Sequence, residues 1–135
     1  MDESLDEAFR DTSYLVNLDT LNWATIRVDL PLPVELRELV GTQPWAFITA
    51  WNPQARRRAQ AENLAAQRDL LAALQALPGT AVRPAIGVGN TGWSEPSLFV
   101  VGADTAMLDI LARRHEQLAY IHGRAGGTAH LRAME

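Results

Sequence analysis

The sequence predicts an α+β fold, or an α/β fold with mixed strands, in which helices pack on a single mixed β-sheet of about five or six strands. Apolar, strand-like runs at 45–51 and 97–102 alternate with the helical pattern of 53–77. Segments 80–89 and 97–102, joined by a glycine-rich loop, predict a hairpin and therefore antiparallel pairing. The length suits one domain, and no repeat or linker interrupts it, so we expect a single globular domain over residues 1–135.

The N-terminal third predicts two short helices around one strand. A helix is expected through Phe9, beginning at the acidic pair of residues 2 and 3. Residues 24–30 alternate apolar and polar side chains, which is typical of a half-exposed strand, and the prolines that follow end it. A second helix is expected over 34–40, closed by Gly41.

The remaining elements are read from leucine spacing and from turn residues. The helix over 53–77 should bury a stripe of leucines before Pro78 and Gly79 stop it: Leu64, Leu71, Leu74 and Leu77. A helix capped by Asp104 or Thr105 should run to about Glu116 with four core residues: Met107, Leu108, Ile110 and Leu111. Short strands are expected at 118–121 and 128–134.

Composition excludes several kinds of chemistry. The chain has no cysteine, which rules out disulfides and thiolate sites, and its 12 basic residues are all arginine, which rules out Schiff-base chemistry and a lysine-dependent phosphate loop. A net charge of −4 argues against nucleic-acid binding. No apolar run approaches the roughly 18 residues that span a bilayer, and the acidic N-terminus does not resemble a signal peptide, so we expect a cytoplasmic protein.

No cofactor and no metal are expected. The three histidines do not share one helix face at ligand spacing: His115, His122 and His130. The glycine loop at 87–92 does not open a helix, as a dinucleotide-binding loop must.

One group of polar residues follows the strand at 45–51. Asn52 and Pro53 are typical of a helix start, whether or not they bind anything. The arginines at 56–58 would lie in the first turn, against the helix dipole, either as a solvated face or as an anion or acidic-partner site in which Arg56 and Arg57 are the candidates. Asn63, beside Glu62, is either a buried structural amide or part of the site.

A second polar group, residues 93–97, precedes the next apolar strand. Glu95 at the mouth of a buried strand would have a raised pKa and could act as a base, or it could accept hydrogen bonds from the preceding glycine loop. Trp93 covers either a pocket or the edge of the core.

Four of these motifs together resemble domain-of-unknown-function family 3293, a family of small bacterial proteins without an assigned activity. They are the run 46–53 (AFITAWNP), the pair 62–63 (EN), the stretch 93–97 (WSEPS) and the stretch 117–120 (QLAY), and the likeness spans roughly residues 12–132. The resemblance implies that the recurrent polar positions meet in space. They fall here on Thr49, Asn52, Asn63, Glu95, Ser97 and Gln117.

Three functions remain open from the sequence. The first is a non-catalytic module whose polar site near Asn52 and Glu95 binds a small anion or a protein partner. The second is a small hydrolase or transferase with Glu95 as general base and Asn52 or Gln117 positioning the substrate. The third is a structural domain in which these side chains only cap helices and satisfy buried amides.

Overall fold

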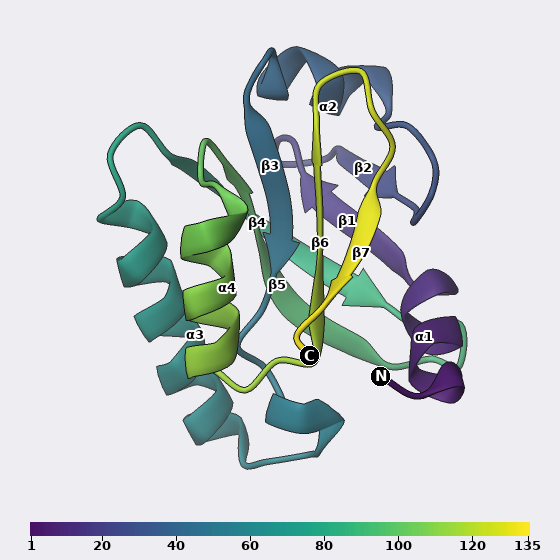
Figure 1. The fold of residues 1–135 in the computed structure, drawn as a ribbon, viewed down its shortest axis with the longest axis vertical. Helices are drawn as coiled ribbons and strands as arrows, with labels where there is room; N and C mark the ends of the chain where they lie inside the picture. Colours follow the sequence, from purple (N-terminus) through teal and green to yellow (C-terminus); the bar gives the residue numbers. More distant parts are fainter.

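The computed structural model describes all 135 residues and confirms an α+β fold (Figure 1). The helices are α1 (Glu3–Arg10), α2 (Val34–Val40), α3 (Gln60–Gln75) and α4 (Thr105–Arg114), with a short 3-10 helix η1 (Pro53–Ala55). The strands are β1 (Ser13–Asn17), β2 (Trp23–Ile26), β3 (Pro44–Ile48), β4 (Ala81–Val88), β5 (Ser94–Val101), β6 (Ala119–Arg124) and β7 (His130–Ala133).

The strands form one seven-stranded sheet in the order β2-β1-β4-β5-β3-β6-β7, and every neighbouring pair is antiparallel. The expectation of five or six strands in a mixed sheet is therefore wrong. The strand that the sequence did not predict is β1, which begins at a serine and ends at an asparagine. Parallel pairs are absent because α3 and α4 each join strands that are not neighbours. Strands β3 and β4 both flank β5, and strands β5 and β6 both flank β3.

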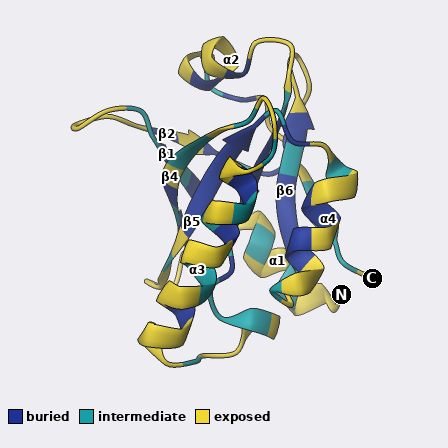
Figure 2. Cartoon of the chain, turned by 90° about the vertical axis from the view of Figure 1, so that its left-hand side faces the viewer, coloured by how far each residue is buried: buried dark blue, intermediate teal, exposed yellow.

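The sheet separates two apolar cores. Helices α3 and α4 cover one face, where Leu70 and Leu74 pack with Leu108 and Leu111. The other face holds an inner core that includes Trp45 and extends to the segments around α2. Figure 1 shows α3 and α4 together on one side of the sheet and α1 on the other, and Figure 2 shows that β5 and β6 are mostly buried.

The sheet curls so far that segments beside its two edge strands meet. Asp29, after β2, donates its backbone N–H to the carbonyl of Ala129 at 2.8 Å, and Ala129 donates to the carbonyl of Leu30 at 2.9 Å. Pro31 and Thr128 form an antiparallel bridge beside these bonds. Because β2 and β7 are the opposite edges of the sheet, these contacts wrap the sheet around the inner core as a partly closed barrel.

The local predictions for three helices are confirmed. Asp2 caps α1 by accepting the backbone N–H of Leu5 at 2.8 Å, and Asp104 caps α4 in the same way. Helix α2 spans the predicted residues and ends at Gly41, whose φ of 59° is strained for any residue with a side chain.

The long helix predicted over 53–77 is wrong at its start. Asn52, Gln54 and Ala55 have positive φ angles of 45°, 57° and 58°. The backbone is extended at Arg56, and α3 begins only at Gln60. Asn52 is therefore not the N-cap of α3, and residues 56–58 do not lie in its first turn.

Three side chains assigned to the core are instead exposed. Leu64 on α3 and Met107 and Ile110 on α4 point to solvent. The predicted strand 24–30 is also shorter, because Asp29 adopts a φ of 69° that no strand residue has. None of the helices is long and apolar enough to cross a membrane.

Candidate functional site

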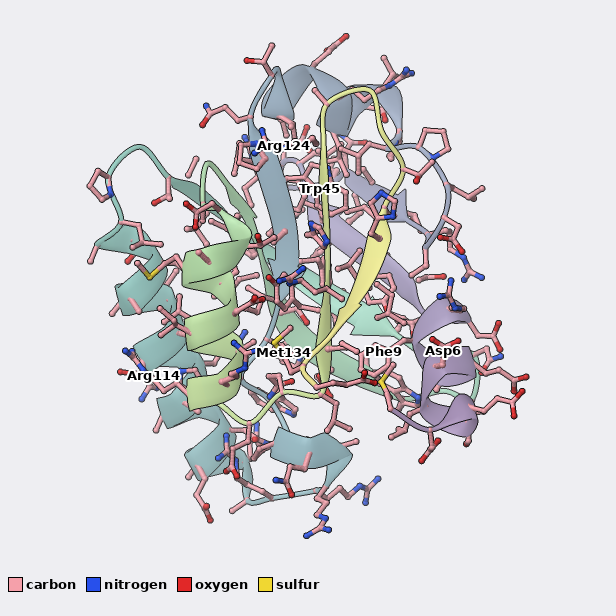
Figure 3. The ribbon with its side chains drawn as sticks, viewed as in Figure 1. Asp6, Phe9, Trp45, Arg114, Arg124 and Met134 are labelled. Carbon is pink, nitrogen blue, oxygen red and sulfur yellow. The ribbon has the colours of Figure 1, made fainter.

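A cavity of about 850 Å³ lies at one end of the curled sheet, between α1, the C-terminal end of β3, the N-terminal end of β5 and the segment 51–58. About half of its lining residues are hydrophobic, including Leu5 and Phe9 of α1. Phe9 lies on the side of α1 that faces the strands (Figure 3). Glu95 is the only acidic residue of the lining, Arg57 and Arg58 are its only cations, and no histidine takes part.

All seven residues predicted to bind a ligand line this cavity. Arg57, one of the two predicted anion-binding residues, lines it as well, whereas Arg56 does not. The seven are Thr49, Asn52, Asn63, Trp93, Glu95, Ser97 and Gln117.

The floor of the cavity is a row of residues across three strands. Tyr14 of β1 pairs with Gly87 of β4, which pairs with Glu95 of β5, so the three positions share one face of the sheet. A Cβ at Gly87 would meet only ordinary contacts, the nearest being the Thr12 Cγ2 at 3.8 Å. Packing therefore does not require a glycine at position 87. Because Gly87 has no side chain, room is left between Tyr14 and Glu95.

Asn63 fastens the segment after β3 to α3. It is 2% exposed, accepts the backbone N–H of Asn52 at 2.9 Å, and donates to the side-chain oxygen of Asn52 at 2.8 Å. The same Asn52 oxygen accepts the backbone N–H of Arg58 at 3.2 Å. The left-handed turn at Asn52 is held by this exchange, while Glu62 is exposed.

Gln67, one turn further along α3, joins the ends of two strands. Its side-chain oxygen accepts the backbone N–H of Ala50 at 2.9 Å, and its amide donates to the carbonyl of Pro96 at 3.3 Å. Thr49 donates its hydroxyl to the same Pro96 carbonyl at 2.7 Å. These bonds fix β3 and β5 relative to α3 at the mouth of the cavity.

Arg58 is held in place without an acidic partner. Its Nε donates to the side-chain oxygen of Asn63 at 2.8 Å and its Nη2 to the carbonyl of Ala50 at 2.9 Å. It forms no salt bridge, although other arginines of the chain do. Both acceptors are neutral, so the guanidinium reaches the cavity as a positioned, uncompensated cation with donors to spare.

Glu95, like Arg58, has no oppositely charged partner, and its carboxylate also makes no hydrogen bond with the chain. Burial raises its pKa from 4.5 to about 7, and no neighbouring charge offsets this. The glycine loop before it donates nothing to the carboxylate, so the alternative that this loop satisfies Glu95 is wrong. Ser97 donates its hydroxyl to the backbone carbonyl of Glu95 at 3.1 Å, not to the carboxylate.

Trp93 and Gln117 complete the rim. The indole of Trp93 lies against Gly89, where a Cβ would come within 2.2 Å of its Nε1, and 43% of the residue remains exposed. Gln117 donates its amide to the backbone carbonyl of Trp51 at 3.2 Å, so it ties the segment before β6 to the segment after β3.

Sequence reasoning missed three contributors to the site. Arg58 is one of three consecutive arginines, and nothing in the sequence distinguishes it from the other two. Gln67 lies four residues after Asn63, so helical spacing alone places both amides on one face of α3. Tyr14 was missed because β1 was missed.

The fold and the site together define a small α+β protein with a curled antiparallel sheet and one polar-rimmed cavity. The model of the protein family of unknown function DUF3293 matches residues 48–120, more than half of the chain, and the chain belongs to this family. The matched segment is shorter than the resemblance over 12–132 suggested, yet it contains every predicted site residue. Neither the curated proteins nor the solved structures include a match.

Proposed function

We propose that the protein is a non-catalytic module that binds a small organic anion with an apolar body in the cavity beneath α1. The single observation that carries the proposal is the state of Arg58 and Glu95. Both charged groups line the cavity and neither is paired within the chain. Buried or half-buried charges usually have partners, so the missing partners belong to a ligand.

The amide side chains of the site serve as scaffold, and the two charged groups are left for a ligand. Asn52, Asn63 and Gln67 are bonded to one another or to backbone groups and serve as scaffold. This is what a purely structural domain would also show. Arg58 has no acidic partner, and the Glu95 carboxylate has neither a cation nor a hydrogen bond from the chain. Both favour binding over that alternative, because a structural network would have paired these charges.

The lining gives less support to catalysis. It holds one carboxylate, so a paired acid and base are missing. The hydroxyls of Thr49 and Tyr14 already donate to backbone carbonyls, of Pro96 at 2.7 Å and of Phe9 at 2.6 Å. Among the hydroxyls of the lining, Tyr120 is bonded to a carboxylate, that of Asp109 at 2.7 Å, but Asp109 lies outside the cavity and is ion-paired with Arg132.

Binding is tested by thermal shift and calorimetry with simple probes. Phenylpropionate and phenyl phosphate should raise the melting temperature, whereas the uncharged phenylpropanol should not. A probe at about 100 times its dissociation constant adds about 2.7 kcal/mol to the free energy of unfolding, which is easily detected.

Two variants and one control place the binding. Arg58→Gln should weaken the binding of the anionic probes at least about tenfold, a loss of about 1.4 kcal/mol in binding free energy. Gly87→Val should also weaken their binding, because the new side chain fills the cavity floor. The backbone should tolerate this change, since a Cβ at Gly87 meets only ordinary contacts. Arg56→Gln, which removes an exposed arginine outside the cavity, should leave them unchanged. No shift with any anionic probe, or equal losses in the Arg58 and Arg56 variants, contradicts the proposal.

A further inference from the structure

We infer that the ligand is a short apolar peptide with both termini free, its carboxylate at Arg58 and its ammonium group at Glu95. This inference rests on the proposed function, because it names the class of small anion that the cavity takes. It gives that anion a second, positively charged group, and so predicts that binding depends on a free amine as well as on a carboxylate.

The Arg58 end of the cavity fits a carboxylate. The guanidinium is fixed at Nε and Nη2 by Asn63 and Ala50, which leaves Nη1 and one Nη2 hydrogen uncommitted. A pre-positioned guanidinium is the usual partner of a planar carboxylate, because its fork of donors matches the two oxygens. Arg57 lines the same cavity and adds positive charge.

The Glu95 end fits an ammonium group. The nearby hydroxyls are already committed, Ser97 to the carbonyl of Glu95 and Tyr14 to the carbonyl of Phe9. No donor of the chain is bonded to the carboxylate, which faces a space floored by Gly87. A ligand cation would provide the hydrogen bonds and the opposite charge that a carboxylate needs when it leaves water.

Arg58 and Glu95 do not pair with each other, and much of the cavity lining is apolar. The two side chains form no ion pair, and burial is the cause that raises the pKa of Glu95. The ligand must therefore carry its charges at separated positions, as a peptide does. The lining includes Phe47, Trp51 and Ile121, which suit apolar side chains of a ligand. A cavity of about 850 Å³ accommodates a dipeptide with room to spare.

Calorimetry with four probes tests the inference: the dipeptide Leu-Phe, its N-acetyl derivative, its C-terminal amide, and phenylpropionate as a simple anion. The free dipeptide should bind best, and each blocking group should weaken it at least about tenfold. Glu95→Gln should weaken the binding of the free dipeptide but not that of the acetylated one. Arg58→Gln should weaken the binding of the free dipeptide but not that of the amide. Glu62→Gln, an exposed carboxylate outside the cavity, is the matched control and should change nothing.

The outcomes separate the inference from the function on which it rests. If the acetylated dipeptide binds as tightly as the free one, or if phenylpropionate binds and no peptide does, the peptide inference fails and anion binding stands. If no probe binds, both fail. Coupling between the blocked amine and Glu95, and between the blocked carboxylate and Arg58, supports the inference, since a merely structural role for either residue would affect all four probes alike.

Discussion

At the scale of the residue, Glu95 lowers the stability of the fold when its carboxylate is ionised. Glu95 is half-buried and its carboxylate has no partner, so burial raises its pKa from 4.5 to about 7. Tyr14 faces it across Gly87, and burial raises the pKa of Tyr14 as well, so the neighbouring group is neutral and offers no compensation. Groups kept at such a cost are typical of binding sites rather than of folding cores.

Replacing Glu95 by glutamine should therefore stabilise the protein at alkaline pH. The folded state holds the Glu95 proton up to about pH 7, whereas the unfolded state releases it near 4.5, so the free energy of unfolding falls across that window. Glu95→Gln removes this loss, and its advantage over wild type should grow by roughly 2 to 3 kcal/mol between pH of about 4 and about 8. Urea denaturation at both pH values measures it, and parallel stabilities of the two proteins would contradict it.

The residues of the site could be predicted from the sequence because polar motifs stand at the ends of apolar, strand-like runs. Asn52, Asn63 and Glu95 stand out in apolar surroundings, and the structure places them around one cavity. Their partners could not be predicted, because hydrogen bonds such as that from Asn63 to Asn52 depend on a left-handed turn that is not visible in the residue pattern.

At the scale of the element, the start of α3 shows a tertiary contact overriding a local signal. Asn-Pro followed by a helical pattern favours a helix start at residue 53. The chain instead makes a short 3-10 turn and an extended segment, because Asn63 and Gln67 reach back from α3 to bond the backbone of Asn52 and Ala50. Helical spacing identifies the amide face of α3, but not what that face contacts.

Gln67→Ala should loosen the end of β3 without unfolding α3. The backbone N–H of Ala50 loses its acceptor and β5 loses a bond at Pro96, which should cost about 1 to 2 kcal/mol. Hydrogen exchange should accelerate at Ala50, while the interior amides of α3 stay protected. Gln75→Ala, an exposed glutamine on the same helix, is the control, and equal exchange in both variants would show that Gln67 does not hold the strand end.

Helix α4 is joined to the sheet through Asp109. Its carboxylate accepts two bonds from Arg132 of β7, at 2.8 and 2.6 Å, and one from Tyr120 of β6 at 2.7 Å. The Arg132 guanidinium lowers the pKa of Asp109 from 3.8 to about 2, and the Tyr120 hydroxyl adds to this effect.

Asp109→Asn should destabilise the protein by about 2 kcal/mol at neutral pH, because the ion pair is lost while Arg132 stays in place. A depressed pKa stabilises the fold above the unfolded value near 3.8, and this stability is lost as pH falls toward 2. The difference between variant and wild type should therefore vanish in acid. Asp104→Asn keeps an equally good helix cap and should be nearly neutral, so equal losses in the two variants would contradict the prediction.

At the scale of the whole molecule, the curled sheet explains both the cavity and the limits of prediction. The alternation of helices and strands and the β4–β5 hairpin could be predicted from residue patterns. The strand order could not, because β3 lies between β5 and β6, which are distant from it along the chain. The closure through Asp29, Leu30 and Ala129 brings together segments about a hundred residues apart. Strand patterns are visible over 24–30 and 128–134, but nothing in either pattern identifies the other segment as its neighbour.

This closure predicts that the chain unfolds as one cooperative unit, as the proposed single domain requires. Both edges of the sheet are tied to each other, and the inner core includes residues from each half of the chain, such as Ile26 and Ile121. Far-UV circular dichroism and tryptophan fluorescence should therefore give the same urea midpoint. Variants that keep one tryptophan sharpen the test, since Trp23 reports the edge strand β2 and Trp51 reports the cavity. A lower midpoint for Trp23 alone would mean that β1 and β2 separate first and that the bonds at Ala129 do not couple the two edges.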